Sequence, residues 1–413
     1  MSKSNSSYRW VIAVVCFFMS FMVLGLGSSP LSLYIVPITK NLGFSRGDFS
    51  LVFTLITFTT MLIQVVFGFF VHRFGVRVLM IAGSILAPIA YFLFYLAGTL
   101  PVFYAGGVIL GSAFAFASIT SISIIVHNWF HEKQGTVLGL IMAASGLGGF
   151  VFSRIIGKYI ATNGFKASFL FSAILLAAAT LPVILFTRSN PDDANNTQSS
   201  KGGHGIGKMS FGSFFKIRGM AVGLLAIFLT GVVIHPLLVN TPAYLVEKGF
   251  DSVFASEISA AIFFVLAFAK LGLGMIHDRL GIRISMILGL GSFIAAALIL
   301  LFAASSWMVW VFVLFDGVAV ATLALLVPLF AKAILGMENY TSFLGVFVAT
   351  LSAGIAVGVP VISYVYDLTG SYSWAVGPFA AVGALALALA MVSLKQADRL
   401  SPEAAEPMAA PAS

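Results

Sequence analysis

The chain has 413 residues, of which 60% are hydrophobic and 9% are charged. Too few polar residues are present to cover the surface of a water-soluble fold. The composition therefore excludes a soluble globular protein and indicates a polytopic membrane protein. The formal net charge is +8, but no basic cluster is interleaved with exposed aromatic residues, so we expect no nucleic-acid partner. Cys16 is the only cysteine, which excludes an internal disulfide and a cysteine-based metal site.

Twelve apolar stretches are long enough to cross a bilayer, which needs about 20 residues for each helix. In chain order they run over about 10–36, 48–71, 78–98, 101–129, 135–160, 166–187, 218–246, 252–276, 284–304, 306–334, 341–366 and 372–395. Such continuously apolar runs differ from the alternating segments of a membrane barrel, so the expected fold class is all-α, with twelve transmembrane helices. The first stretch lacks an A-x-A-like cleavage signal, and we expect it to be retained.

The order of these stretches predicts two lobes of six helices each. The N-terminal lobe spans 1–187 and the C-terminal lobe spans 218–397. Between them, 188–217 is rich in Gly, Ser and Asn and cannot bury a core, which predicts a flexible cytoplasmic linker. The segment 398–413 is rich in Ala, Pro and Glu and is predicted to be a disordered tail. His204 in the linker has no second ligand at metal spacing, and we expect neither a metal nor a cofactor.

The distribution of basic residues predicts the orientation in the membrane. With both termini in the cytoplasm, fifteen Lys and Arg residues lie inside and five lie outside, which satisfies the positive-inside rule. We therefore expect a multi-pass protein of the cell membrane, either inner or plasma membrane, with cytoplasmic termini. We expect a monomer.

A long internal repeat links the two halves. The decapeptide Gly68–Arg77 returns as Gly274–Arg283, at an offset of 206 residues, and the same offset maps Pro30 onto Pro236 and Gly139 onto Gly345. Self-similarity at this period, in the same order, is typical of parallel repeats related by an axis along the membrane normal.

The repeated stretch also carries a family resemblance. Two six-helix lobes, a long central loop and a G-x-x-x-D-R-x-G-x-R stretch after spans two and eight resemble the major facilitator superfamily across nearly the whole chain. The resemblance implies that this stretch latches the lobes together on the cytoplasmic side; an alternative is that its arginines only set orientation. His72 stands where the family has Asp, which predicts a weaker latch in the N-terminal lobe. The predicted latch residues are Gly68, Arg73, Arg77, Gly274, Asp278, Arg279 and Arg283.

Within that superfamily, the chain is most similar to the monocarboxylate and oxalate/formate branch. The stretch Trp129–Gly135 resembles the branch's entry to span five, and Val36–Ser45 resembles its exit from span one. Drug/proton antiporters carry an Arg four residues before the span-four glycine, where this chain has Gly107 before Gly111. That departure speaks against the antiporter branch.

Lys270 is the strongest candidate for binding substrate. It precedes Asp278 by eight residues, which places it about 12 Å from the cytoplasmic surface and near the middle of the bilayer. A cation at that depth must face a cavity or a counter-charge, and in transporters it often meets an anion; the alternative is a structural role. The resemblance implies the same role, because the branch carries a substrate-binding Arg here. Its repeat mate is Gln64, which could add a hydrogen bond.

Asp316 lies about 15 Å deep in span ten and could pair with Lys270. Binding of a substrate carboxylate together with a proton on Asp316 would then replace the pair and couple anion uptake to protons. A permanent structural ion pair, or a carboxyl held protonated, is the alternative. Leu266 and Leu351 stand where the branch has further charges, which disfavours a dicarboxylate.

Six further residues are weaker candidates for the substrate site. His235 and Ser29 each precede a proline that can bend a helix, and His235 could bind substrate, carry a proton or simply pack. Phe114 could wall an apolar cavity, and Arg154 lies near the outer interface, where it either snorkels or contacts substrate. Asn240 and Tyr244 follow His235 along span seven.

These features predict a proton-coupled monocarboxylate symporter that works by alternating access, with a small organic anion, protons and the bilayer as its partners. An organic-anion exchanger of oxalate/formate type is the alternative within carriers. A channel or a non-transporting nutrient sensor is the alternative from other classes. No nucleophile–base pair or metal-ligand spacing is present, so we do not expect an enzyme.

Overall fold

The computed structural model describes residues 3–27, 29–44, 46–130, 132–189 and 219–398. Within these ranges all regular structure is helical. The predicted linker and tail lie almost wholly outside the described residues, so the linker and lobe boundaries stay predictions.

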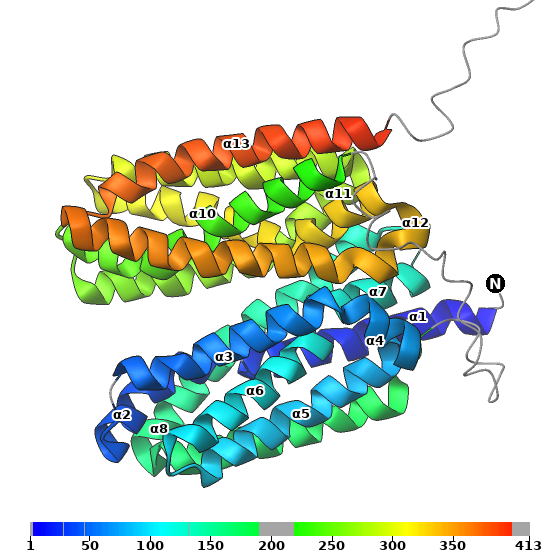
Figure 1. Ribbon diagram of the computed structural model, residues 1–413, viewed down its shortest axis with the longest axis horizontal. Coiled ribbons are helices and arrows are strands. Elements are labelled where there is room, and N and C mark those ends of the chain that lie inside the picture. Colours follow the sequence, from blue (N-terminus) through cyan, green and yellow to red (C-terminus); the bar gives the residue numbers. More distant parts are fainter. Residues whose placement is uncertain (1–2, 28, 45, 131, 190–218, 399–413) are drawn as a thin grey trace, which may run out of the picture.

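The helices form two groups that follow the order of the chain. The first group, in the lower half of Figure 1, contains α1 (Lys3–Met19), the π-helix η1 (Ser20–Leu26), the 3-10 helix η2 (Ser29–Tyr34), α2 (Ile35–Leu42), α3 (Arg46–Val65), α4 (Phe67–Phe74), α5 (Val76–Leu96), α6 (Leu100–Phe116), α7 (Ile119–Trp129) and α8 (Gln134–Phe186). The second group, in the upper half, contains α10 (Met220–Glu247), α11 (Ser252–Leu301), α12 (Ser306–Thr369) and α13 (Ser373–Asp398). We call these groups the N-terminal and C-terminal lobes.

The described helices provide twelve segments that can cross a membrane. Nine helices are long and apolar enough, and the bent pair of α3 and α4 forms a tenth. Two of these ten are far longer than one bilayer and turn back at a glycine, α8 at Gly164 (φ 80°) and α11 at Gly281 (φ 79°). Glycine adopts such positive φ values at little cost, so it forms these sharp corners between consecutive spans. The predicted all-α fold with twelve spans is confirmed.

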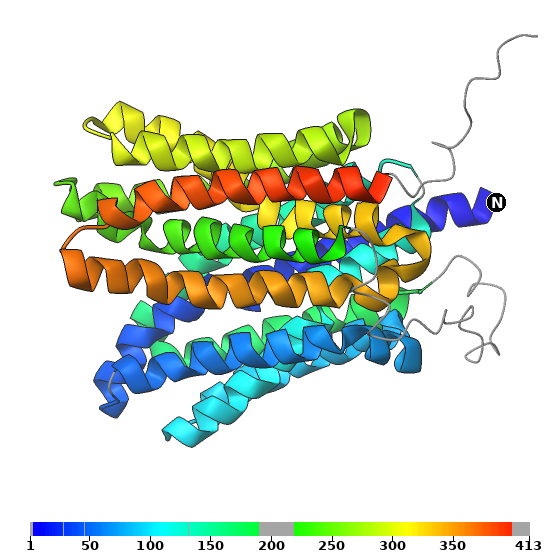
Figure 2. The same ribbon diagram turned by 45° about the horizontal axis from the view of Figure 1, so that its top comes forward.

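The first described helix begins, and the last one ends, on the same side of the bundle. The N-terminal helix and the end of α13 point to the same end of the molecule in Figure 1 and in Figure 2. We call this end the terminal side and the opposite end the far side.

Three spans of the N-terminal lobe are interrupted, although their repeat mates are not. The first span is divided among α1, η1, η2 and α2, the second bends by 63° between α3 and α4, and the fourth breaks between α6 and α7. The equivalent spans in α10, α11 and α12 run on as continuous helices. The sequence pattern predicted each of these spans as one unbroken run, because hydropathy depends on residue type and not on backbone conformation.

The interruption in the first span is stabilised by tyrosines. Tyr91 Oη donates to the carbonyls of Leu26 and Gly27 at 3.3 and 3.2 Å, so carbonyls at the break are not left without partners. Tyr34 stacks on Phe169 with ring centroids 4.0 Å apart, and its hydroxyl lies 2.8 Å from Ser168 Oγ. Irregular backbone at membrane depth is tolerated where protein groups satisfy it in this way.

The two lobes meet at two equivalent helix crossings. Gly139 of α8 packs on the backbone carbonyl of Lys270 in α11, and Gly345 of α12 packs on the carbonyl of Gln64 in α3. An added Cβ at either glycine would overlap the carbonyl. The two contacts are related by the 206-residue offset, so the repeat in the sequence returns as a repeated contact between the lobes. Small residues allow the backbones to approach this closely.

Gly274→Ala should open the terminal side, because a Cβ there would overlap the carbonyl of Gly135 in the other lobe. Overpacking of this kind costs about 1–3 kcal/mol, which lowers the ratio of closed to open protein by roughly 5- to 150-fold. The measurement is the distance between spin labels at Val78 and Ile284, two exposed repeat-related positions beside the terminal-side corners, after replacement of Cys16.

Gly272→Ala is the matched control, because an added Cβ there would meet nothing within 4 Å. Equal label distances in the two variants would contradict the assignment of Gly274 to the contact between the lobes.

Candidate functional site

Lys270 is a buried cation held by the opposite lobe. Its side chain is 5% exposed. Nζ donates to the carbonyl oxygen of Met142 at 3.2 Å and to Ser145 Oγ at 3.1 Å, and both acceptors belong to α8. In the described part of the chain, no carboxylate lies within ion-pair distance of Nζ. The ammonium is therefore ligated by neutral oxygens at the crossing of the two lobes.

Gln64, the repeat mate of Lys270, bonds within its own lobe. Its Nε2 donates to the carbonyl of Ala115 and to Ser118 Oγ, both at 3.0 Å, and its Oε1 accepts from Thr120 Oγ1 at 2.8 Å. These three partners surround the break between α6 and α7. Gln64 thus satisfies the backbone of the interrupted span, and it does not meet Lys270 in this conformation.

Asp316 of α12 is fully buried and has no hydrogen-bond partner for either carboxylate oxygen. The next residue, Gly317, packs against Val265 and Leu266 of α11. Leu266 precedes Lys270 by four residues, so Asp316 lies about one helical turn away from Lys270 along the axis of α11. Within the described residues no ion pair joins Asp316 to Lys270. The expected pairing is therefore absent in this conformation, and two buried ionisable groups stand separately near the middle of the C-terminal lobe.

Two of the three candidates on α10 form hydrogen bonds within the C-terminal lobe. His235 is partly buried, and its Nδ1 has no hydrogen-bond partner. Asn240 Nδ2 donates to the carbonyl of Pro236 at 2.9 Å, which uses its amide on its own helix. Tyr244 is 1% exposed, and its hydroxyl lies 2.8 Å from Ser373 Oγ at the start of α13. Of the three, only His235 has a buried polar side-chain atom, Nδ1, that makes no hydrogen bond and could bind a substrate or a proton.

The candidates in the N-terminal lobe are separated from one another. Ser29 begins η2, next to the interruption of the first span. The Phe114 ring packs at Gly27 beside the same interruption. Arg154 is exposed, and its guanidinium lies 4.2 Å from the centroid of the Phe150 ring. Neither Phe114 nor Arg154 bonds to Lys270, whose ammonium binds Met142 and Ser145, and the predicted substrate roles of all three residues stay predictions.

The latch on the terminal side depends on Asp278. Its two carboxylate oxygens accept from the backbone N–H groups of Gly135 (2.8 Å) and Thr136 (2.7 Å) at the beginning of α8. A carboxylate at a helix N-terminus gains both charge-assisted hydrogen bonds and a favourable helix dipole. Next to it, Lys332 Nζ donates to Gln134 Oε1 at 2.5 Å. Both contacts join α8 to the C-terminal lobe.

At the equivalent place in the N-terminal lobe, His72 makes a different contact. Its Nε2 lies 2.8 Å from Ser342 Oγ of α12. The chain turns at Gly336 (φ 67°), so residues 341 and 342 follow the first four residues of the resumed helix and their N–H groups bond within it. An Asp at position 72 would therefore find no free N–H groups to bond. This accounts for the presence of His72, which bonds the hydroxyl of Ser342 instead.

The arginines of the repeated stretch contribute less to the latch than predicted from the resemblance. Arg73, Arg77 and Arg279 are exposed, and none has a bonding partner among the described residues. Arg283 is also exposed but does interact with a neighbour. Gly68 and Gly274 act through close packing, against the backbones of Ser342 and Gly135.

Asp278→Asn should weaken closure of the terminal side, because an asparagine amide has only one acceptor oxygen: one of the two charge-assisted bonds is lost and the other becomes a neutral bond about half as strong. We expect the ratio of closed to open protein to fall about tenfold, as read by the label pair at Val78 and Ile284. His72→Ala, which removes a single hydrogen bond to a hydroxyl, should change the ratio much less. Equal effects of the two variants would contradict an asymmetric latch.

Four residues at the site were not predicted from the sequence: Gln134, Met142, Ser145 and Lys332. A usable signal existed for two of them. Gly139 and Gly146 mark the face of α8 that meets α11, and Met142 and Ser145 lie along that face at helical spacing. The other two lie at helix ends whose mutual approach only the fold determines.

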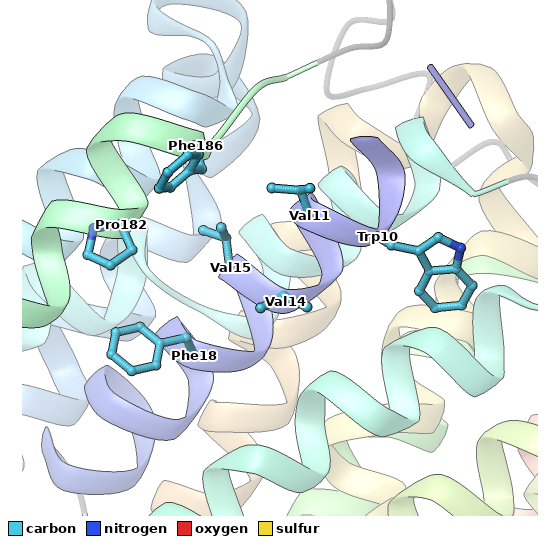
Figure 3. A pocket seen from close by; sticks show the side chains of 7 residues that line it. All are labelled: Trp10, Val11, Val14, Val15, Phe18, Pro182 and Phe186. Carbon is cyan, nitrogen blue, oxygen red and sulfur yellow. The ribbon is translucent and has the colours of Figure 1, made fainter. Parts of the chain in front are cut away.

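A groove of about 530 Å³ lies between α1 and the end of α8 on the outside of the N-terminal lobe. Figure 3 shows its lining, with Pro182 and Phe186 on one side and five residues of α1 on the other. The lining residues are Trp10, Val11, Val14, Val15, Phe18, Pro182 and Phe186. A surface of this kind suits hydrocarbon chains and offers nothing to an anion, so the groove is not the candidate site.

The fold and the site together define a two-lobed helical membrane protein with a cation at the crossing of its lobes. A family model of the Major Facilitator Superfamily matches residues 12–281, and the chain belongs to that superfamily. Members of this superfamily are transporters and not enzymes.

Similar proteins include carriers with named substrates. The chain is 25% identical over 184 residues to the oxalate:formate antiporter of Oxalobacter formigenes, covering 44% of this chain and 43% of the antiporter. It is 27% identical over 163 residues to monocarboxylate transporter 9 of Rattus norvegicus, covering 37% of this chain and 30% of that protein. The chain thus spans less than half the length of these curated relatives.

A solved structure resembles nearly the whole chain. A variant of the E. coli fucose:proton symporter FucP superposes with a TM-score of 0.74 at 16% identity, covering 93% of this chain and 99% of FucP. At this identity the likeness concerns the fold alone.

Proposed function

We propose that the protein is a secondary active transporter of a small organic anion, a monocarboxylate that moves together with a proton. Transport proceeds by rocking of the two lobes, which exposes a site between them first to one side of the membrane and then to the other.

The observation that carries this proposal is the environment of Lys270. Its ammonium is buried between the lobes and has two neutral oxygen ligands but no carboxylate partner in the described chain. A buried charge without a counter-charge is costly, and a carboxylate that enters the site supplies the missing negative charge. A single lysine binds it as a point charge and not through a bidentate fork, which favours a monocarboxylate.

Asp316 is the proposed site of the coupling proton. A carboxyl that is fully buried without hydrogen-bond partners favours its neutral, protonated form, because burial penalises the charge. The proton would be released when the rocking lobes expose the group to water. His235, with a buried nitrogen that has no partner, is a second candidate for the same role.

The relatives support the substrate class. One carries oxalate and formate and another is named for monocarboxylates, so carboxylate transport is a consistent expectation for this chain. We further propose that the protein lies in the cell membrane with both termini in the cytoplasm, because fifteen of the twenty assigned basic residues then lie inside.

A counterflow screen of carboxylates in proteoliposomes tests the proposal. We expect saturable uptake of one or more monocarboxylates, accelerated by an inward proton gradient and slowed by a protonophore. Absence of saturable uptake for every carboxylate tested would overturn the substrate class.

The same screen separates the alternatives. An exchanger of oxalate/formate type would require an internal anion and would be insensitive to the protonophore. A channel would show no counterflow, and a sensor would bind the anion without accumulating it.

A further inference from the structure

We propose that Ser145 and the carbonyl of Met142 form an interlobe tether that holds Lys270 while the site is empty, and that the carboxylate of the cargo displaces them. This inference rests on the proposed function and adds a positioning role for Ser145. It makes opening of the terminal side depend on occupancy of the site.

The tether is a closed triangle of polar atoms. Lys270 Nζ donates to Met142 O at 3.2 Å and to Ser145 Oγ at 3.1 Å, and Ser145 Oγ itself donates to Met142 O at 2.8 Å. The serine proton is used within α8, which leaves the hydroxyl lone pairs to accept from the ammonium. An ammonium has three donors, so one remains for an arriving anion.

The tether lies where the lobes must separate. Gly139, one turn from Met142 on α8, packs on the backbone carbonyl of Lys270 itself. Further toward the terminal side, Gly135 packs against Gly274 and bonds to Asp278. Opening the terminal side pulls α8 away from α11 along this line, and Lys270 cannot stay on α11 and keep its α8 acceptors.

An empty carrier that opens therefore strips a buried ammonium of both its ligands. Removing the partners of a buried charge is strongly unfavourable, because the charge then keeps its full desolvation cost. A carboxylate belongs to neither lobe and can satisfy the ammonium from the cavity. Once it has replaced Ser145 and Met142, the lobes can part while Lys270 stays ligated.

Only one of the two crossings carries this device. At the other, Gln64 satisfies all its bonds within its own lobe, with Ala115, Ser118 and Thr120. The repeat mate of Ser145 is Leu351, which cannot bond a polar group. Binding of cargo therefore lowers the cost of separating α8 from α11. The cost of separating α3 from α12 is the same whether or not the site is filled.

The test compares Ser145→Ala, which removes the hydroxyl, with Ser145→Thr, which keeps it, and with Ser153→Ala on the same helix as a matched control. The first readout is the distance between spin labels at Val78 and Ile284 in the empty protein. Loss of one hydrogen bond to a charged group should raise the ratio of open to closed protein about tenfold in Ser145→Ala. Ser145→Thr and Ser153→Ala should match the parent.

The second readout is transport. Return of the empty carrier limits efflux into substrate-free buffer but is bypassed in exchange, so Ser145→Ala should raise the efflux rate relative to exchange by several fold. A purely structural role for Ser145 would lower both rates together. Unchanged label distances and an unchanged ratio of efflux to exchange would overturn the tether.

The label distances of the empty protein need no substrate. If the carboxylate screen fails but Ser145→Ala still shifts the distances, the substrate class is wrong and the tether stands. If carboxylates are transported but neither the label distances nor the ratio of efflux to exchange changes in Ser145→Ala, the tether is wrong and the substrate class stands.

Discussion

Lys270→Gln should abolish saturable anion transport and leave the folded protein in the membrane. Glutamine has nearly the reach to bond Met142 O and Ser145 Oγ, so the crossing of α8 and α11 can still form. It carries no charge for a carboxylate. Loss of one partner of a buried charged interaction costs about 2–5 kcal/mol, which corresponds to a fall in kcat/KM of roughly 30- to several thousand-fold.

The measurement is initial uptake in proteoliposomes at matched protein content, with thermal unfolding as the check on folding. Lys270→Arg keeps the positive charge and should retain part of the activity, although its planar fork alters the geometry of carboxylate binding. Lys395→Gln, at an exposed position near the end of α13, is the control for loss of a cation. Wild-type uptake by Lys270→Gln would remove the basis for an anionic substrate.

Asp316→Asn should separate anion transport from the proton gradient. An asparagine at this fully buried position keeps the shape of the carboxylic acid but cannot release a proton. Proton-driven accumulation of the anion should therefore be lost, whereas exchange of labelled for unlabelled anion should persist. Uptake by the parent protein should rise as the external pH falls, and uptake by Asp316→Asn should stay flat across the same range.

Glu257→Gln, an exposed carboxylate of α11, serves as the control and should keep the pH response of the parent. A His235→Gln variant shows whether the histidine carries the proton instead. If Asp316→Asn accumulates the anion in response to a pH gradient as the parent does, Asp316 is not the coupling group.

The sequence determined the membrane fold more completely than the site. Twelve spans could be predicted because each needs only a run of apolar residues, and the repeat was visible because paired glycines keep a constant offset. Depth along a helix follows from residue counting, so Lys270 and Asp316 could be placed near the middle of the bilayer.

The partners of these residues could not be predicted in the same way. Lys270 bonds residues 125 and 128 positions away in the chain, and nothing in the local pattern selects them over Asp316. The latch of Asp278 depends on where α8 begins, and the contact of His72 depends on the turn at Gly336. Such contacts are set by how two lobes meet, and a helical pattern describes only one helix at a time.

The interrupted spans of the N-terminal lobe have a mechanical consequence. A helix that is already divided can swing about its break without losing further hydrogen bonds within the helix, whereas an intact helix must lose some of them to bend. We therefore expect the N-terminal lobe to be the more pliable of the two, whereas α11 and α12 hold Lys270 and Asp316 on a stiffer frame. On the proposed function, selectivity for charge and tolerance for shape are then expected of opposite lobes.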